Sequence, residues 1–104
     1  MSRIQAQKIA ERFRERLEEE KYPFSAVYLF GSHATGKARE ESDIDIAVLS
    51  KKLEKNWNEN EELLWKIGVE VDSRIEPHGF SPKDFEENWI PMVSEIKKTG
   101  IKIG

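Results

Sequence analysis

Apolar and charged residues near the start of the chain alternate at a helical spacing. Apolar side chains recur from Ile4 to Leu17, and most of the residues between them are charged or polar. This pattern predicts an amphipathic helix, which Pro23 terminates. Two short apolar runs follow, SAVYLF at 25–30 and IDIAVL at 44–49. Each is too short for a helix of ordinary length, so both predict buried strands.

The second half of the chain predicts another helix and a third strand. Apolar residues between Leu53 and Ile67 indicate the helix, and Gly68 is expected to stop it. From Val69 to Ile75 apolar and polar residues alternate, which predicts a strand with one polar face. The residues expected on that polar face are Glu70, Asp72 and Arg74.

The end of the chain predicts two short helices and an edge strand. Ser81-Pro82 is typical of a helix N-terminus, and the helix that it opens is expected to reach Trp89. Pro91 begins the next helix, Gly100 ends it, and Ile101 and Ile103 follow as a strand. The predicted fold is a small mixed α/β (α+β) sheet flanked by helices. The tryptophans are interpreted as core or helix-packing residues, namely Trp57, Trp65 and Trp89.

Length and composition narrow the classes of protein that remain. The 104 residues suit a single domain over 1–104, and 17 basic against 20 acidic residues give a net charge of −3. That balance argues against binding long nucleic acids. The absence of cysteine excludes disulfides and thiol catalysis. No apolar run is long enough to span a membrane, and Met1 leads into a charged segment, so we expect a cytoplasmic protein.

Four residues at the ends of the two apolar runs carry the candidate chemistry. Gly31-Ser32 follows the first run, and Asp43 and Asp45 open the second. Residues two apart on a strand point to the same side, so both carboxylates can hold hard divalent cations. Glycine and serine in a turn can bind phosphate through backbone N–H groups and a hydroxyl. Acidic pairs also occur on solvated strand faces, but this strand is too apolar to face water, which favours a metal site.

Two other interpretations of the same stretch fit less well. GSHATGKA at 31–38 nearly matches a phosphate-binding P-loop, but Ala38 stands where a hydroxyl must hold Mg²⁺. Asp43-Ile44-Asp45 could form an aspartyl-phosphate site, but those aspartates would follow their strand, whereas here they precede it. Neither His33 nor His78 has a partner at metal-ligand spacing, so both are predicted to be exposed or hydrogen-bonded.

The stretch GSHATGKAREESDIDIAVLS resembles the signature of the DNA polymerase beta-like nucleotidyltransferase superfamily. It is most similar to the minimal nucleotidyltransferase (MNT) proteins, which have Gly-Ser, ten residues and then Asp-x-Asp. Here Gly31-Ser32 is followed by ten residues and then by Asp43-Ile44-Asp45, and Ser42 also matches. The resemblance implies a polymerase-beta-like fold and the transfer of a nucleoside monophosphate, such as AMP from ATP, to a hydroxyl.

The resemblance also implies the roles of individual residues. Asp43, Asp45 and Asp72 would be the catalytic carboxylates and would hold two Mg²⁺ ions, with Glu70 as the alternative to Asp72. The residues implied to bind the nucleotide are Gly31, Ser32, Lys37 and Ser42. Lys37, like Arg39, is equally well explained as a solvated loop cation.

The resemblance further implies a partner, because larger relatives carry a second, helical domain. Many short members of the family are antitoxins that act on a helical HEPN protein, in some cases by adenylylating it. Self-association is the other way to complete such a site. Two alternatives remain open: a binding module that neutralises a helical partner by occlusion, and an enzyme that adenylylates a small molecule such as an aminoglycoside.

Overall fold

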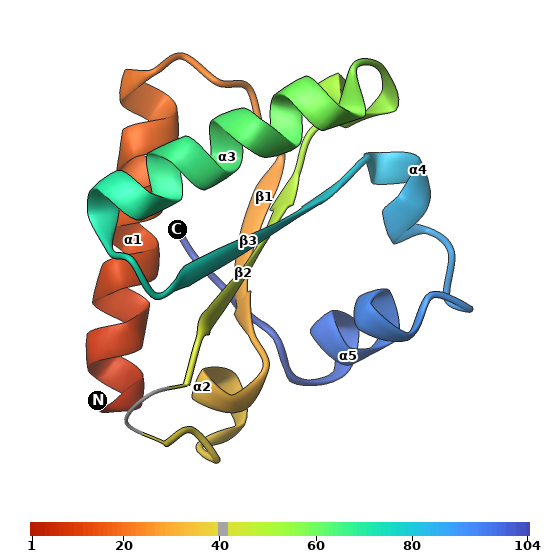
Figure 1. Cartoon of the computed structure of the whole chain (residues 1–104). Coiled ribbons are helices and arrows are strands. Elements are labelled where there is room, and N and C mark those ends of the chain that lie inside the picture. Colours follow the sequence, from red (N-terminus) through yellow and green to blue (C-terminus); the bar gives the residue numbers. More distant parts are fainter. Residues whose placement is uncertain (40–41) are drawn as a thin grey trace.

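The computed structural model, which describes residues 1–39 and 42–104, has a four-stranded mixed sheet with helices on both faces (Figure 1). The strand order is β3-β2-β1-β4; β2 pairs with β1 antiparallel and with β3 parallel. The strands are β1 (Ala26–Phe30), β2 (Ile44–Leu49), β3 (Ile75–Phe80) and β4 (Ile101–Lys102). The helices are α1 (Arg3–Glu19), α2 (Ser32–Thr35), η1 (Lys51–Glu54, a 3-10 helix), α3 (Trp57–Val71), α4 (Pro82–Phe85) and α5 (Pro91–Thr99).

The sequence pattern correctly predicts α1, β1 and β2 in the first half of this fold, but not the short helix α2. A capping box between Ser2 and Gln5 begins α1, and the buried stripe Ala6, Ala10, Phe13 and Leu17 faces the sheet. Both apolar runs form strands, as predicted, at Ala26–Phe30 and Ile44–Leu49. The mixed α/β fold class is therefore confirmed.

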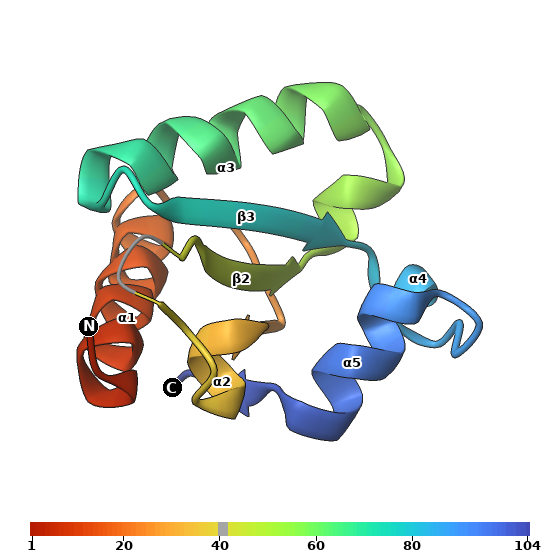
Figure 2. The ribbon, with the colours of Figure 1, turned by 60° about the horizontal axis from the view of Figure 1, so that its bottom comes forward.

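Alternate residues of the sheet enter two separate layers of packing. The layer that α1 and α3 cover takes Ile44, Ile46 and Val48 of β2. The opposite layer, against α5, takes Phe30 of β1 and Ala47 of β2. Figure 2 shows α3 on one side of the strands and α2 with α5 on the other. Because side chains alternate along a strand, Asp45 must face the α2 and α5 side.

The third strand lies six residues later than predicted. Gly68 does not stop the helix: α3 continues to Val71, so the first three residues of the segment expected as a strand at 69–75 are the end of this helix. Gly68 instead lets α3 approach the sheet, since a Cβ there would lie 3.1 Å from Ile75 Cγ2. The strand begins at Ile75 and runs through Pro77, which an edge strand tolerates because it has one unpaired side.

Two further expectations are corrected at the surface and near the end of the chain. The three tryptophans are not core residues; Trp57, Trp65 and Trp89 are 47%, 46% and 76% exposed. The helix that begins after Ser81 ends at Phe85, well short of Trp89. The helix at Pro91 and the short final strand form as predicted.

Among the described residues, no helix combines the length and the apolar character that crossing a bilayer needs.

Candidate functional site

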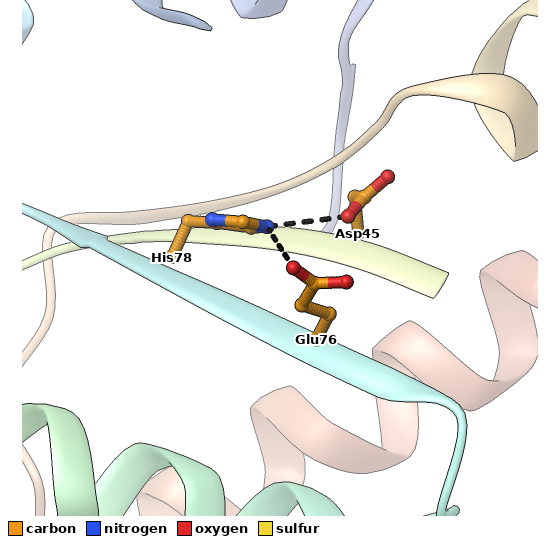
Figure 3. Close-up of side chains that lie close together, drawn as sticks. All are labelled: Asp45, Glu76 and His78. Atoms are coloured by element: carbon orange, nitrogen blue, oxygen red, sulfur yellow. Dashed lines mark hydrogen bonds and ion pairs between the residues drawn. The ribbon is translucent and has the colours of Figure 1, made fainter. Parts of the chain in front are cut away.

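Acidic and imidazole side chains meet on the face of the sheet that α2 and α5 flank. Asp45 on β2 lies directly opposite Glu76 on the parallel strand β3. His78 follows two residues later on β3, so it points to the same face as Glu76. Figure 3 shows the three side chains turned toward one another. We call Asp45, Glu76 and His78 the β2–β3 cluster.

The β2–β3 cluster is compact and only partly open to solvent. His78 Nε2 lies 3.2 Å from Asp45 Oδ1 and 3.8 Å from Glu76 Oε1. The three side chains are 20–37% exposed. The His78 ring also packs edge-on against Phe30, with 5.2 Å between ring centroids. Packing and hydrogen bonding therefore orient the imidazole before any ligand binds.

Negative charge is concentrated at this cluster. Burial, the adjacent carboxyl of Asp43 and the charge of Asp45 raise the pKa of Glu76, while His78 acts in the opposite direction. Within 1–39 and 42–104, no lysine or arginine forms an ion pair with Asp43, Asp45 or Glu76. Ionising all of these neighbouring carboxyl groups costs free energy, because like charges repel, and a bound cation offsets that cost. The arrangement thus favours binding of a positive ion.

The Gly31-Ser32 turn lies against the same carboxylates. Phe30, the last residue of β1, pairs with Asp45, and Gly31 then takes a φ of +75° before α2 begins. A Cβ at Gly31 would lie only 2.5 Å from Asp45 Oδ2. Glycine is therefore required at this turn both by the backbone conformation and by the close approach to the carboxylate.

The remaining residues of the predicted phosphate loop have different environments. Lys37 is exposed and follows Gly36, the left-handed residue that ends α2. Ser42 Oγ accepts a hydrogen bond from Arg39 N at 2.8 Å, and the Ser42 carbonyl lies 3.3 Å from Nε2 of buried His33. Ser42 therefore closes the loop, and His33 is a hydrogen-bonded histidine, as predicted. Glu40 and Glu41 of this loop lie outside the described residues.

The two candidates for the third carboxylate, Asp72 and Glu70, both make their side-chain contacts with residues outside the β2–β3 cluster. Asp72 ends α3, and its carboxylate accepts hydrogen bonds from Arg74 N, Nε and Nη2 at 2.8–3.0 Å. These bonds to Arg74 lower the pKa of Asp72. Glu70 lies on α3 and forms an ion pair with Arg16 of α1 at 3.0 Å. Each carboxylate thus already has a guanidinium partner.

Glu76 and His78 are the site residues that the sequence analysis did not select. The signal that could have found them is the alternation of Ile75, Pro77 and Gly79 with the polar residues Glu76 and His78, shortly before the helix cap at Ser81. Pro77 obscured it, because proline usually argues against a strand. Because the strand begins six residues later than predicted, Glu76, and not Asp72, lies opposite Asp45.

The donor set of this cluster fits a divalent metal ion. Asp45, Glu76 and His78 can each offer one ligand atom, and these atoms lie within 4.8 Å of one another. Two carboxylates are the ligands that proteins most often give to Mg²⁺ beside substrate phosphates. The backbone of Gly31 lies close enough to Asp45 for phosphate and metal to share the site.

A Gly-Ser turn beside acidic residues on paired strands of a small mixed sheet defines a domain of the nucleotidyltransferase class. The model of the nucleotidyltransferase domain family matches residues 8–101, and the chain belongs to this family. No curated protein matches the sequence significantly.

Solved structures show the same fold in other proteins. A candidate nucleotidyltransferase from Sulfolobus solfataricus has a TM-score of 0.68 and 19% identity, over 96% of this chain and 80% of that one. A toxin–antitoxin crystallised with AMP-PNP has a TM-score of 0.65 and 24% identity, over 90% of this chain and 72% of that one. The toxin–antitoxin MntA–HpeT, with two aspartates changed to glutamate, has a TM-score of 0.62 and 21% identity, over 89% of this chain and 70% of that one.

Proposed function

We propose that this protein transfers a nucleoside monophosphate, AMP from ATP, to a hydroxyl group of a partner protein. The observation that carries the proposal is the position of Asp45, which faces Glu76 across two parallel strands and contacts the Gly31 turn. Membership of the nucleotidyltransferase domain family supports the same reaction class. A similar toxin–antitoxin structure contains AMP-PNP, an ATP analogue, which supports ATP as the donor.

The proposed metal ligands are Asp43, Asp45 and Glu76, with Glu76 in the role that the sequence analysis gave to Asp72. Two Mg²⁺ ions bound there would offset charge on the attacking and leaving oxygens. Asp43 directly precedes β2 and its carboxyl lies beside that of Glu76, so Asp43 and Asp45 can both hold these ions. We assign to Glu76, whose pKa is raised by burial and by the neighbouring carboxyl groups, the role of accepting the proton of the attacking hydroxyl.

The Gly31-Ser32 turn is proposed to bind the phosphates. Its backbone N–H groups and the Ser32 hydroxyl would hold the β- and γ-phosphates, as oriented N–H groups do in anion-binding turns. Lys37 is exposed beyond α2 and can offset phosphate charge from there. Ser42 contributes indirectly, because its hydroxyl already orders the loop through Arg39 N.

Binding of ATP should depend on the metal and on the paired aspartates. We expect calorimetric titration to show ATP binding that Mg²⁺ strengthens at least about tenfold in the wild type, because the metal screens phosphate from the carboxylates. The variant Asp43→Asn/Asp45→Asn should lose that metal-dependent gain.

The matched control removes two charges elsewhere. Glu11 and Glu15 are exposed acidic residues on α1, and Glu11→Gln/Glu15→Gln should bind ATP and Mg²⁺ as the wild type does. Equal ATP affinity for wild type and Asp43→Asn/Asp45→Asn in the presence of Mg²⁺ would exclude the proposed metal site.

We further propose that the acceptor is a helical HEPN-type protein and that this chain is the antitoxin of the pair. The support is the MNT resemblance together with the two toxin–antitoxin structures that share the fold. The second candidate function is neutralisation of the partner by occlusion, without catalysis. It is favoured by Trp89, which is 76% exposed beside α5, as an aromatic anchor for a partner would be.

Association should therefore depend on the surface around Trp89 and Met92. We expect sedimentation velocity to show self-association or a complex with a helical HEPN-type partner protein. Truncation at an interface anchor typically costs about 2 kcal/mol or more, so Trp89→Ala should weaken association about 30-fold. Trp65→Ala, at an exposed tryptophan on α3, is the control. A strict monomer that binds no such partner would contradict the proposal.

A further inference from the structure

An imidazole stands among the proposed metal ligands, although the proposed reaction needs only carboxylates there. His78 Nε2 is directed at Asp45 and Glu76, as Figure 3 shows. We propose that His78 is a metal ligand and that the site therefore binds a first-row transition ion such as Mn²⁺ more tightly than Mg²⁺. This inference rests on the proposed function, since it concerns the identity of the ion at the same site.

The distances fit donors that share one ion. Nitrogen and oxygen ligands lie about 2.1 Å from a small divalent metal, so two adjacent donors at a right angle are about 3 Å apart. His78 Nε2 lies 3.2 Å from Asp45 Oδ1 and 3.8 Å from Glu76 Oε1. An ion placed between the three atoms needs only small side-chain rotations to complete the contacts.

The backbone and the core hold His78 in this orientation. The pairing of Ala47 with His78 continues the register that places Asp45 opposite Glu76. The ring of Phe30 packs against the imidazole from β1. His78 thus loses little freedom when it binds a metal, which favours its use as a ligand.

The chemistry of the donors distinguishes between metals. Mg²⁺ prefers oxygen ligands, whereas imidazole nitrogen suits first-row transition ions; Mn²⁺ also takes oxygen ligands but accepts an imidazole more readily than Mg²⁺ does. Replacing one water or carboxylate by imidazole therefore favours Mn²⁺ over Mg²⁺. The competing role for His78 is that of a protonated counter-ion for Asp45 and Glu76. A protonated imidazole repels every divalent cation, so the two roles predict opposite effects when His78 is removed.

The test compares the two metals in wild-type protein and in His78→Gln. We expect calorimetry to show Mn²⁺ binding at least about tenfold tighter than Mg²⁺ in the wild type. Loss of an outer-shell partner of a metal ligand already costs about 10- to 100-fold in affinity. His78→Gln should therefore lose at least about tenfold in Mn²⁺ affinity, and less than about threefold in Mg²⁺ affinity. Unchanged or increased Mn²⁺ affinity in His78→Gln overturns the proposal.

A spectroscopic readout on the wild type does not depend on the variant folding. Electron spin echo modulation of bound Mn²⁺ should show coupling to a directly bound nitrogen, and ¹⁵N-histidine labelling should change that coupling. The chain has two histidines, and His33 is 2% exposed with its Nε2 beside the Ser42 carbonyl, so the signal reports on His78. Bound Mn²⁺ without nitrogen coupling overturns the proposal.

Failure of the proposed function gives a different result. If Asp45→Asn leaves Mn²⁺ and Mg²⁺ affinity unchanged, or if neither ion binds the wild type, the metal site itself is wrong and both proposals fall. If both ions bind and both depend on Asp45, but Mn²⁺ shows no preference and no nitrogen coupling, only the role of His78 is wrong.

Discussion

Replacing Glu76 by glutamine should abolish nucleotidyl transfer, whereas Asp72→Asn should leave it nearly unchanged. Glu76 faces Asp45 across the parallel strands, while the Asp72 carboxylate is occupied by three hydrogen bonds from Arg74. A metal ligand that also accepts a proton contributes several kcal/mol in the transition state. We therefore expect Glu76→Gln to lower the turnover rate at least about a thousandfold.

The effects of the same two variants on stability should be reversed: Asp72→Asn should destabilise the fold, whereas Glu76→Gln should not. Asp72→Asn removes the charge that Arg74 pairs with, and a partly exposed pair of this kind contributes up to about 1 kcal/mol. Because folding lowers the pKa of Asp72, this contribution is present above the unfolded pKa and is lost as the pH falls through the folded pKa. Glu76→Gln removes repulsion from Asp43 and Asp45 and should not destabilise the fold.

Transfer of label from α-labelled ATP to the purified partner measures the rate, and urea unfolding measures the stability. Glu70→Gln serves as a second control, because Glu70 lies on α3, which covers the other face of the sheet, and pairs there with Arg16 of α1. Loss of transfer in Asp72→Asn with normal transfer in Glu76→Gln would restore the assignment made from the sequence. If Glu76→Gln still neutralises the partner without transfer, occlusion is the function.

The part of the site that the sequence predicts is the part formed by residues close together along the chain. Gly31-Ser32, Asp43 and Asp45 lie in or next to β1 and β2, which follow one another along the chain, and the antiparallel pairing of these two strands is local. The proposed third carboxylate, Glu76, lies on β3, beyond a 15-residue helix whose end decides which residue faces Asp45. That end depends on how α3 packs on the sheet, and a contact of this range leaves only a weak local signal.

Two residue types misled the sequence analysis for opposite physical reasons. Gly68 was expected to end a helix, but its missing side chain instead allows close packing against Ile75 and Phe13. Val69 was expected to face the core of a strand, yet it is 61% exposed on α3. Valine is favoured in strands, so the alternation at 69–75 fitted a strand until tertiary packing extended the helix over it.

The sequence alone does not point to His78, because neither of its partners stands at a recognised metal-ligand spacing. Asp45 is far away in the sequence, and Glu76 is two residues away on the same strand. Asp45 is 33 positions earlier, and no spacing rule along the chain connects the two. A histidine beside a proline gives no metal-ligand pattern by itself. Only the parallel register of β2 and β3 places the imidazole beside the carboxylates.

Replacing Gly31 by alanine should damage the site far more than replacing Gly36 by alanine. Both glycines have positive φ, +75° and +80°, and both flank α2. An alanine in such a conformation costs about 1–3 kcal/mol, so both variants should lose stability of that order. At Gly36 the new Cβ would lie 3.1 Å from Arg3 Nη2, which is the end of a flexible side chain and can move away.

At Gly31 the new Cβ would lie 2.5 Å from Asp45 Oδ2 and 3.3 Å from its Cγ, so the carboxylate itself must shift. A displacement of about 1 Å in a catalytic group can cost about a hundredfold in rate. We expect Gly31→Ala to lose about a hundredfold in transfer and to weaken metal binding, and Gly36→Ala to keep both within a few fold. Urea unfolding, metal titration and the labelled transfer assay should be run on both variants. Equal losses of transfer would show that backbone strain around α2, and not contact with Asp45, is what Gly31 relieves.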